Sequence, residues 1–166
     1  MCGKINSEKP LWAPWRIEYI LSPKSGECFL CNRETDKNSE DEFMVLYRGE
    51  KAFIILNAYP YNPGHLLISP YKHIGDISEV SKKTLYEISD LSVRAKDVLS
   101  EIMTPNGFNI GYNLGVSAGA GLEEHLHLHI VPRWNGDNNF MPVIGKTRIM
   151  PQALKETAAI IRDKFK

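Results

Sequence analysis

The segment His125-Leu126-His127-Leu128-His129-Ile130-Val131 places three of the five histidines of the chain at alternating positions. Successive side chains of a β-strand point to opposite faces, so this segment is predicted to be a strand with three imidazoles on one face and Leu126, Leu128 and Ile130 in the core. A polar strand surface facing solvent is the simplest alternative, but Lys, Thr or Glu are more usual there. We therefore interpret the segment as a functional site held in place by core packing.

Further strands are predicted on both sides of one long helix. Two β-rich runs are separated by Arg48-Gly49-Glu50, which suits a short hairpin connection, and a third run follows Pro63-Gly64. The predicted strands are Glu42–Tyr47, Ala52–Asn57, His65–Ser69 and Phe108–Asn113. The polar stretch Asn32–Asp41 is predicted to be a loop.

Helical periodicity appears twice. From about Ser78 to Met103, apolar residues recur every three or four positions, which indicates a long amphipathic helix that ends at Thr104-Pro105-Asn106-Gly107. Its apolar positions are Leu85, Ile88, Leu91, Ala95, Val98 and Ile102. A C-terminal helix carries Leu154, Ala158, Ile161 and Phe165 at the same spacing. Hairpins around one long helix predict an α+β fold with a mainly antiparallel sheet.

Length and charge limit the possible partners. The chain has 166 residues, 43% of them hydrophobic, which suits a single core. Its 20 Lys and Arg balance 20 Asp and Glu, so we expect no nucleic-acid partner, and any anionic ligand must be held by local donors. No apolar run approaches the roughly 20 residues needed to cross a bilayer, so we expect no membrane association and a cytoplasmic location.

Two kinds of chemistry suit the histidine segment. A catalytic metal ion could be shared by neighbouring imidazoles, but the outer two stand about 13 Å apart along a strand and can hardly meet on one ion. A neutral imidazole could instead attack an activated phosphorus and form a covalent phosphoramidate. The segment Asn113–Gly121 favours phosphorus, because its small residues let backbone amides approach an anion. Asn113 and Ser117 add side-chain donors.

The histidine pattern resembles the histidine-triad (HIT) superfamily of nucleotide hydrolases and transferases. The family signature, His-φ-His-φ-His-φ-φ with φ apolar, is met by residues 125–131, and the segment from Asn57 to Pro70 resembles the nucleotide-binding strand of the family. Segments 11–16 and 132–140 resemble the bacterial branch that includes diadenosine tetraphosphate (Ap4A) phosphorylases. The resemblance implies one HIT domain over residues 1–166, with a core at about 28–140, an N-terminal arm and a C-terminal helix.

The resemblance also implies roles for individual residues. His127 would be the nucleophile, His129 would contact the reacting phosphate, and His65 would lie on the same pocket wall. Nucleotide binding is expected from Asn57, Asn113, Ser117, Gly119 and Gly121. The Gln or Ser that many relatives carry shortly before the triad is replaced here by Gly121-Leu122-Glu123-Glu124, so the leaving-group donor departs from the family pattern.

Cys28-Phe29-Leu30-Cys31 has the spacing of a zinc knuckle, but two cysteines supply only half of a tetrahedral structural site. In zinc-bearing HIT proteins, the resemblance implies that His73 and His125 complete the site. We expect about one structural zinc ion per chain and no organic cofactor. Thiol redox chemistry and unliganded thiols remain the alternatives.

The resulting hypothesis is an enzyme that cleaves an adenine nucleotide or a dinucleoside polyphosphate such as Ap4A at the α-phosphorus, through a nucleotidyl-His127 intermediate. The acceptor could be water, inorganic phosphate or another nucleotide. A homodimer is expected by resemblance. The alternatives are a zinc-stabilised nucleotide-binding module with little turnover, and a zinc hydrolase that uses the triad as ligands.

Overall fold

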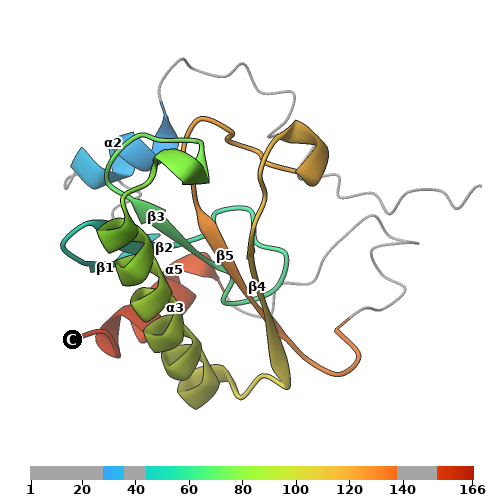
Figure 1. The fold of residues 1–166 in the computed structure, drawn as a ribbon. Coiled ribbons are helices and arrows are strands. Elements are labelled where there is room, and N and C mark those ends of the chain that lie inside the picture. The colour runs from blue at the N-terminus through green and yellow to red at the C-terminus, as the bar shows by residue number, and fades with distance from the viewer. Residues whose placement is uncertain (1–27, 36–43, 138–152) are drawn as a thin grey trace, which may run out of the picture.

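The computed structural model describes residues 28–35, 44–137 and 153–166, and its strands form one five-stranded antiparallel sheet (Figure 1). The strands are β1 (Val45–Arg48), β2 (Ala52–Leu56), β3 (Leu66–Pro70), β4 (Gly107–Tyr112) and β5 (Leu128–Arg133), in the order β1-β2-β3-β5-β4. The predicted α+β class is confirmed. The predicted N-terminal arm, residues 42–43 of the first predicted strand and residues 138–140 lie outside the described residues.

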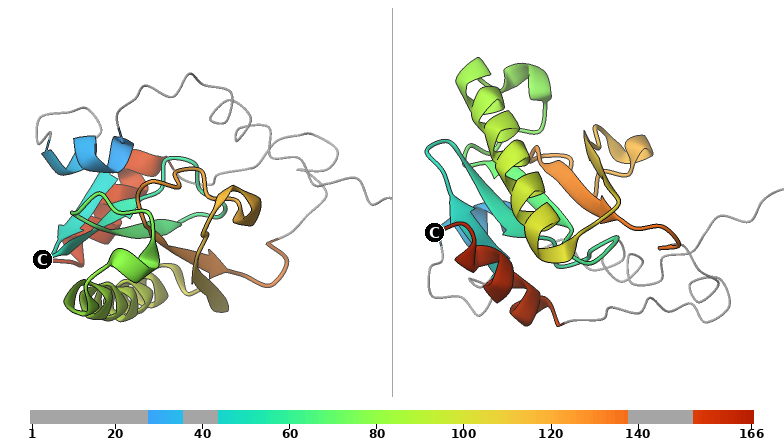
Figure 2. Two further views of the ribbon diagram at one scale, coloured as in Figure 1. Left: turned by 45° about the horizontal axis from the view of Figure 1, so that its top comes forward. Right: turned by 90° about the horizontal axis from the view of Figure 1, so that it is seen from below.

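The long helix α3 (Lys82–Met103) lies along one side of the sheet, and α2 (Phe29–Thr35) lies on the other (Figure 2). Of the six predicted apolar positions of α3, Ile88, Leu91, Ala95 and Val98 are buried, and Leu85 and Ile102 are half-buried. Leu99, which the spacing did not predict, is also buried. The helix begins later than predicted because the Ser81 side chain caps it by accepting from the Thr84 N–H, and Ile77–Glu79 forms a separate 3-10 turn, η2.

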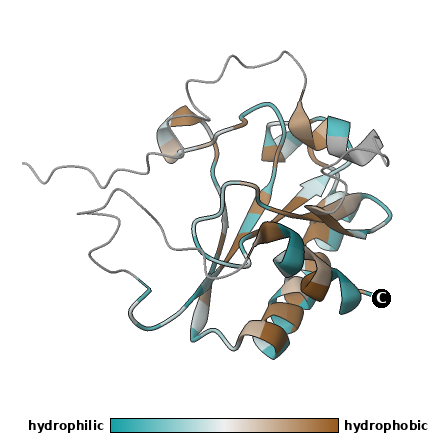
Figure 3. Cartoon of the chain, turned by 180° about the vertical axis from the view of Figure 1, so that it is seen from behind, coloured by the Kyte–Doolittle hydropathy of each residue, from teal (hydrophilic) through white to brown (hydrophobic). Residues whose placement is uncertain are grey.

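The C-terminal helix α5 (Leu154–Asp163) is confirmed and packs against β1 and α3. Ala158 and Ile161 are fully buried, and the Arg162 guanidinium donates to the Val45 carbonyl at 2.9 Å. Every residue of β2 and β3 is buried, and Figure 3 shows that the helices carry both hydrophobic and hydrophilic residues. No helix within the described ranges is long and apolar enough to span a membrane.

Two local expectations are corrected. Asn32–Thr35 is helical, as part of α2, because the fully buried Leu30 anchors this turn in the core and packing overrides its turn-rich composition. The ladder of β5 begins at Leu128 rather than at His125. The Leu126 N–H donates to the Ile74 carbonyl at 2.6 Å, outside the sheet, so residues 125–127 are not part of the strand ladder.

Strand register places one row of side chains on the α2 side of the sheet. Ile55 pairs with Leu67, Leu67 with His129, and His129 with Gly111. Neighbours in register share a face of the sheet, so the side chains of Ile55, Leu67 and His129 lie in one row, which we call the floor row.

Candidate functional site

Two cysteines and two histidines meet where α2, the end of β3 and the start of β5 come together. Cys28 Sγ lies 3.2 Å from His125 Nδ1, and Cys31 Sγ lies 3.4 Å from His73 Nδ1. All four donor atoms lie within 4.8 Å of one another. The predicted juxtaposition of Cys28, Cys31, His73 and His125 is confirmed, and the group could hold a metal ion.

The buried His125 ring is oriented for this cluster. Its Nε2–H donates to the Pro70 carbonyl at 2.8 Å, which leaves the Nδ1 lone pair directed at the two sulfurs. Burial lowers the pKa of His125, although the hydrogen bond to Pro70 opposes this shift. A neutral imidazole with its lone pair toward the sulfurs is the form that a metal ligand needs.

His127 lies with His129 at a cavity and not with His125 at the cysteine cluster, so the three imidazoles do not share one face as predicted, because residues 125–127 are outside the strand ladder. The His127 Nδ1–H donates to the His125 carbonyl, 2.8 Å away, so the neutral ring carries its lone pair on Nε2. Burial lowers the pKa of His127, which favours that neutral form. The side chain is 8% exposed, and it can act as a nucleophile at a group placed beside Nε2.

His129 and His65 form a second imidazole pair. The His129 and His127 rings lie 4.9 Å apart between centroids, in an edge-to-face arrangement. His65 is fully buried, and its Nε2 lies 3.0 Å from His129 Nδ1. The three triad imidazoles are therefore divided, with His125 at the cysteine cluster and His127 and His129 together. This division is inconsistent with one ion held by all three.

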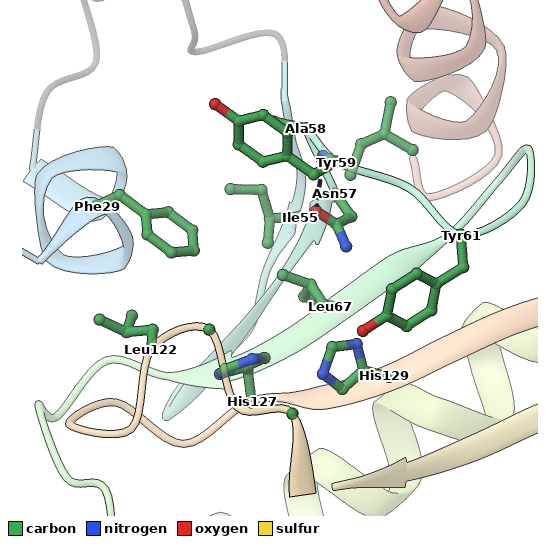
Figure 4. A pocket seen from close by; sticks show the side chains of 13 residues that line it. Phe29, Ile55, Asn57, Ala58, Tyr59, Tyr61, Leu67, Leu122, His127 and His129 are labelled. Carbon is green, nitrogen blue, oxygen red and sulfur yellow. Dashed lines mark hydrogen bonds between the residues drawn. The ribbon is translucent and has the colours of Figure 1, made fainter. Parts of the chain in front are cut away.

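A cavity of about 210 Å³ opens over the floor row (Figure 4). Its walls are mainly apolar and aromatic, and His127 and His129 lie at one end. The described lining residues are Phe29, Ile55, Leu56, Asn57, Ala58, Tyr59, Tyr61, Leu67, Gly119, Gly121, Leu122, His127 and His129. Apolar walls with a few polar groups at one end are typical of a small-molecule site.

Most of the predicted nucleotide-binding residues surround this cavity. Asn57, Gly119 and Gly121 line it directly. Asn113 lies in the two adjoining cavities, and its amide Nδ2 donates to the Gly119 carbonyl at 3.5 Å. Ser117 lies on the exposed 3-10 turn η3 (Val116–Ala118), away from the described lining.

Sequence reasoning missed the aromatic wall of the cavity. Phe29 comes from the cysteine segment, and Tyr59 and Tyr61 come from the loop between β2 and β3. The Tyr61 ring stacks on His129 with centroids 5.9 Å apart. The only available signal was the position of both tyrosines just after Asn57, next to the segment that resembles a nucleotide-binding strand.

The fold and the site define a protein with buried imidazoles at one end of a cavity and a separate cluster of two cysteines and two histidines that could hold a metal ion. The HIT domain family model matches residues 38–136. The chain is 36% identical to an AP-4-A phosphorylase of Mycobacterium tuberculosis over 169 residues, which covers 96% of this chain and 85% of that protein. The chain belongs to the HIT family.

Other relatives extend this similarity. A bis(5'-nucleosyl)-tetraphosphatase (asymmetrical) of Schizosaccharomyces pombe is 28% identical over 56% of this chain and 50% of its own length. A zinc-bound histidine triad family protein from Mycobacterium smegmatis has a TM-score of 0.67 and 26% identity, covering 84% of this chain and 94% of that one. A hypothetical histidine triad nucleotide-binding protein from Sulfolobus tokodaii has a TM-score of 0.63 and 29% identity, covering 83% of this chain and 91% of that one.

Proposed function

We propose that the protein is an enzyme that cleaves dinucleoside polyphosphates such as Ap4A at the α-phosphorus, by nucleotidyl transfer to His127. The observation that carries this proposal is the placement of His127 and His129 side by side at one end of the cavity. The hydrogen bond from His127 Nδ1 to the His125 carbonyl directs the free lone pair to Nε2. Similarity to an AP-4-A phosphorylase supports the substrate class.

The proposed reaction has two steps. His127 Nε2 attacks the α-phosphorus, a nitrogen–phosphorus bond forms, and the bond to the bridging oxygen breaks, so that Ap4A releases ATP. An acceptor then attacks the same phosphorus and returns the electron pair to Nε2. Inorganic phosphate as acceptor yields ADP, and water yields AMP. His129 would stabilise charge on the phosphoryl oxygens, and Asn113 and the glycine-rich segment would supply further donors.

Zinc is the proposed metal at the cysteine cluster. Two thiolates and two imidazoles are the ligand set of tetrahedral structural zinc sites, and such a site leaves no open position for substrate. When bound, zinc would join α2 to the segments before α3 and β5. We therefore propose one structural zinc ion per chain, held by Cys28, Cys31, His73 and His125. A cytoplasmic homodimer with one HIT domain per chain remains part of the proposal.

The test is turnover of Ap4A by the purified protein, with and without inorganic phosphate, followed by separation of the nucleotides. We expect ATP and ADP when phosphate is the acceptor, and ATP and AMP when water is. A protein that binds Ap4A but releases no product would support a nucleotide-binding module instead and would overturn the proposal. His127→Ala serves as the control for a contaminating activity.

A further inference from the structure

The segment Pro132–Asp137 follows the triad directly, and the proposed chemistry makes no use of it. The chain turns at Gly136, whose φ of 80° lies in the left-handed region, and returns Asp137 to the end of β5. There the Arg133 guanidinium pairs with the Asp137 carboxylate through two hydrogen bonds, Nε to Oδ2 at 2.6 Å and Nη2 to Oδ1 at 2.9 Å. Arg133 Nη1 also donates to Asn109 Oδ1 at 2.7 Å.

This geometry argues against Arg133 as a phosphate ligand. Among the described residues that line the cavities around His127 and His129, Arg133 is the only lysine or arginine. Three of its five N–H donors, however, are directed at Asp137 and Asn109, and the carboxylate compensates its charge. The Arg133 guanidinium also holds the pKa of the Asp137 carboxyl well below its ordinary value. An incoming phosphate would meet a neutral pair.

The Asp137 carboxylate makes a second contact, 75 residues back along the chain. Asn62 Nδ2 donates to Asp137 Oδ2 at 2.8 Å and to the Pro132 carbonyl at 2.9 Å. Asn62 belongs to the loop between β2 and β3 that contains Tyr61. Arg133, Asp137 and Asn62 therefore fasten this loop to the end of β5, and we call these three residues the bracket.

The loop between β2 and β3 contacts the His65 ring, which is paired with His129, and these contacts determine which ring nitrogens carry hydrogen. The Tyr61 backbone N–H donates to His65 Nδ1 at 3.0 Å, and Asn57 Nδ2 lies 3.2 Å from the same nitrogen. Because Nδ1 accepts, neutral His65 carries its hydrogen on Nε2 and donates to His129 Nδ1, 3.0 Å away. Neutral His129 then carries its own hydrogen on Nε2.

We propose that the bracket residues Asn62, Asp137 and Arg133 are positioning residues that set the tautomers of His65 and His129, so that His129 offers a hydrogen rather than a lone pair at Nε2. The Asn62 backbone carbonyl accepts from the backbone N–H of His65 at 3.2 Å, so the loop that the Asn62 side chain holds in place leads directly into His65. A hydrogen on Nε2 suits a phosphoryl oxygen that gains charge during attack by His127, whereas a lone pair would repel it. The effect on catalysis rests on the proposed function. The tautomers of His65 and His129 do not depend on that function.

The first test is NMR of protein labelled with 15N in its histidines, without nucleotide. In the wild-type protein, we expect the hydrogen of His129 on Nε2 and that of His65 on Nε2. Asn62→Ala should convert both signals to mixed tautomers. The matched control is Asn106→Ala. The Asn106 side-chain oxygen accepts from the Asn135 N–H, so this change removes that hydrogen bond but no side-chain contact of the bracket, and the backbone bond from the Asn106 N–H to the Arg133 carbonyl stays. Unchanged tautomers in Asn62→Ala, or the same mixing in Asn106→Ala, would overturn the proposal.

The second test is the single-turnover rate of nucleotidyl-enzyme formation with Ap4A. Asn62→Ala should slow this rate on the order of 10²-fold, while the Kd for Ap4A changes by less than about threefold. Asp137→Ala should act through the same contact, so the double variant should lose about as much as the more damaging single variant. If the two rate losses multiply in the double variant, Asn62 and Asp137 act independently, which would contradict the proposal that they act through one contact.

Two arrangements keep the tests decisive. If Asn62→Ala does not fold, Asn62→Leu replaces it, because the leucine side chain keeps about the size of the amide but cannot donate to the Asp137 carboxylate or to the Pro132 carbonyl. If the wild-type protein forms no nucleotidyl-enzyme, the proposed function fails, and the tautomer measurement still decides whether the bracket sets His65 and His129.

Discussion

Gly75→Ala tests the close packing that brings the two histidines of the metal cluster together. A β-carbon at position 75 would lie 2.3 Å from the Glu123 carbonyl oxygen and 3.2 Å from Glu124 Cα. Both are backbone atoms, so no side-chain rotation can relieve the overlap. Gly75 lies two residues after His73, and Glu123 lies two residues before His125, so any separation here reaches the cluster.

The size of the effect follows from these distances. Ordinary contact begins at 3.4 Å, so the two segments must separate by about 1.1 Å, which is 3.4 Å minus 2.3 Å. That is several times the tolerance of about 0.2 Å in a metal–ligand distance. Overpacking of this kind costs about 1–3 kcal/mol, which lowers the melting temperature of a chain of this size by about 2–12 °C.

The assay is thermal unfolding together with metal analysis of the purified protein. Gly75→Ala should melt at a lower temperature and hold less than one zinc ion per chain. Gly107→Ala is the matched control, because its added β-carbon would meet nothing within 4 Å, and its melting temperature should stay within about 2 °C of wild type. A Gly75→Ala protein with wild-type melting and a full zinc content would refute the reasoning.

Three further predictions concern separate parts of the molecule. Cys28→Ser should lower both the zinc content and the melting temperature under reducing conditions, and unchanged values of both would exclude the site. Gly119→Val should weaken the binding of a non-hydrolysable nucleotide measured by calorimetry, because Gly119 has a φ of 87°, and Asn113→Ala should cost about 1–3 kcal/mol of binding or transition-state stabilisation. The ion pair holds the pKa of Asp137 below its ordinary value of 3.8, so this carboxylate stabilises the fold above about pH 4 and the stabilisation is lost as the pH falls through the lower folded-state pKa. Asp137→Asn should therefore show a smaller fall in melting temperature between neutral and acidic pH, and an equal fall would contradict the assignment.

Alternation and helical spacing were sufficient to predict the framework of the site. Leu128 and Ile130 are buried in the core, and because strand side chains alternate, His129 between them lies on the opposite face of β5. The same alternation continues through His127, although residues 125–127 leave the ladder. Residues 125–127 leave the ladder because the Leu126 N–H donates to the Ile74 carbonyl. This is a tertiary contact, which the local sequence pattern does not predict.

The remaining features depend on contacts between distant segments. The cavity wall combines Phe29 with Tyr59 and Tyr61, which only the folded chain brings together. Asn62 and Asp137 are 75 residues apart, and neither residue type identifies its partner. The metal cluster is an exception, because the resemblance to zinc-bearing relatives named all four residues that the structure groups.

The most direct test of the central claim is peptide mapping by mass spectrometry after brief mixing with Ap4A and denaturation at alkaline pH, where a phosphoramidate survives. We predict an adenylyl group on the peptide that contains His127, and specifically on that residue. His127→Asn should bind Ap4A and carry no such group, because the change removes the nucleophile and leaves the phosphate donors in place. Product formation by the wild-type protein with no adduct, or with the adduct on another residue, would contradict the assignment of His127 as the nucleophile.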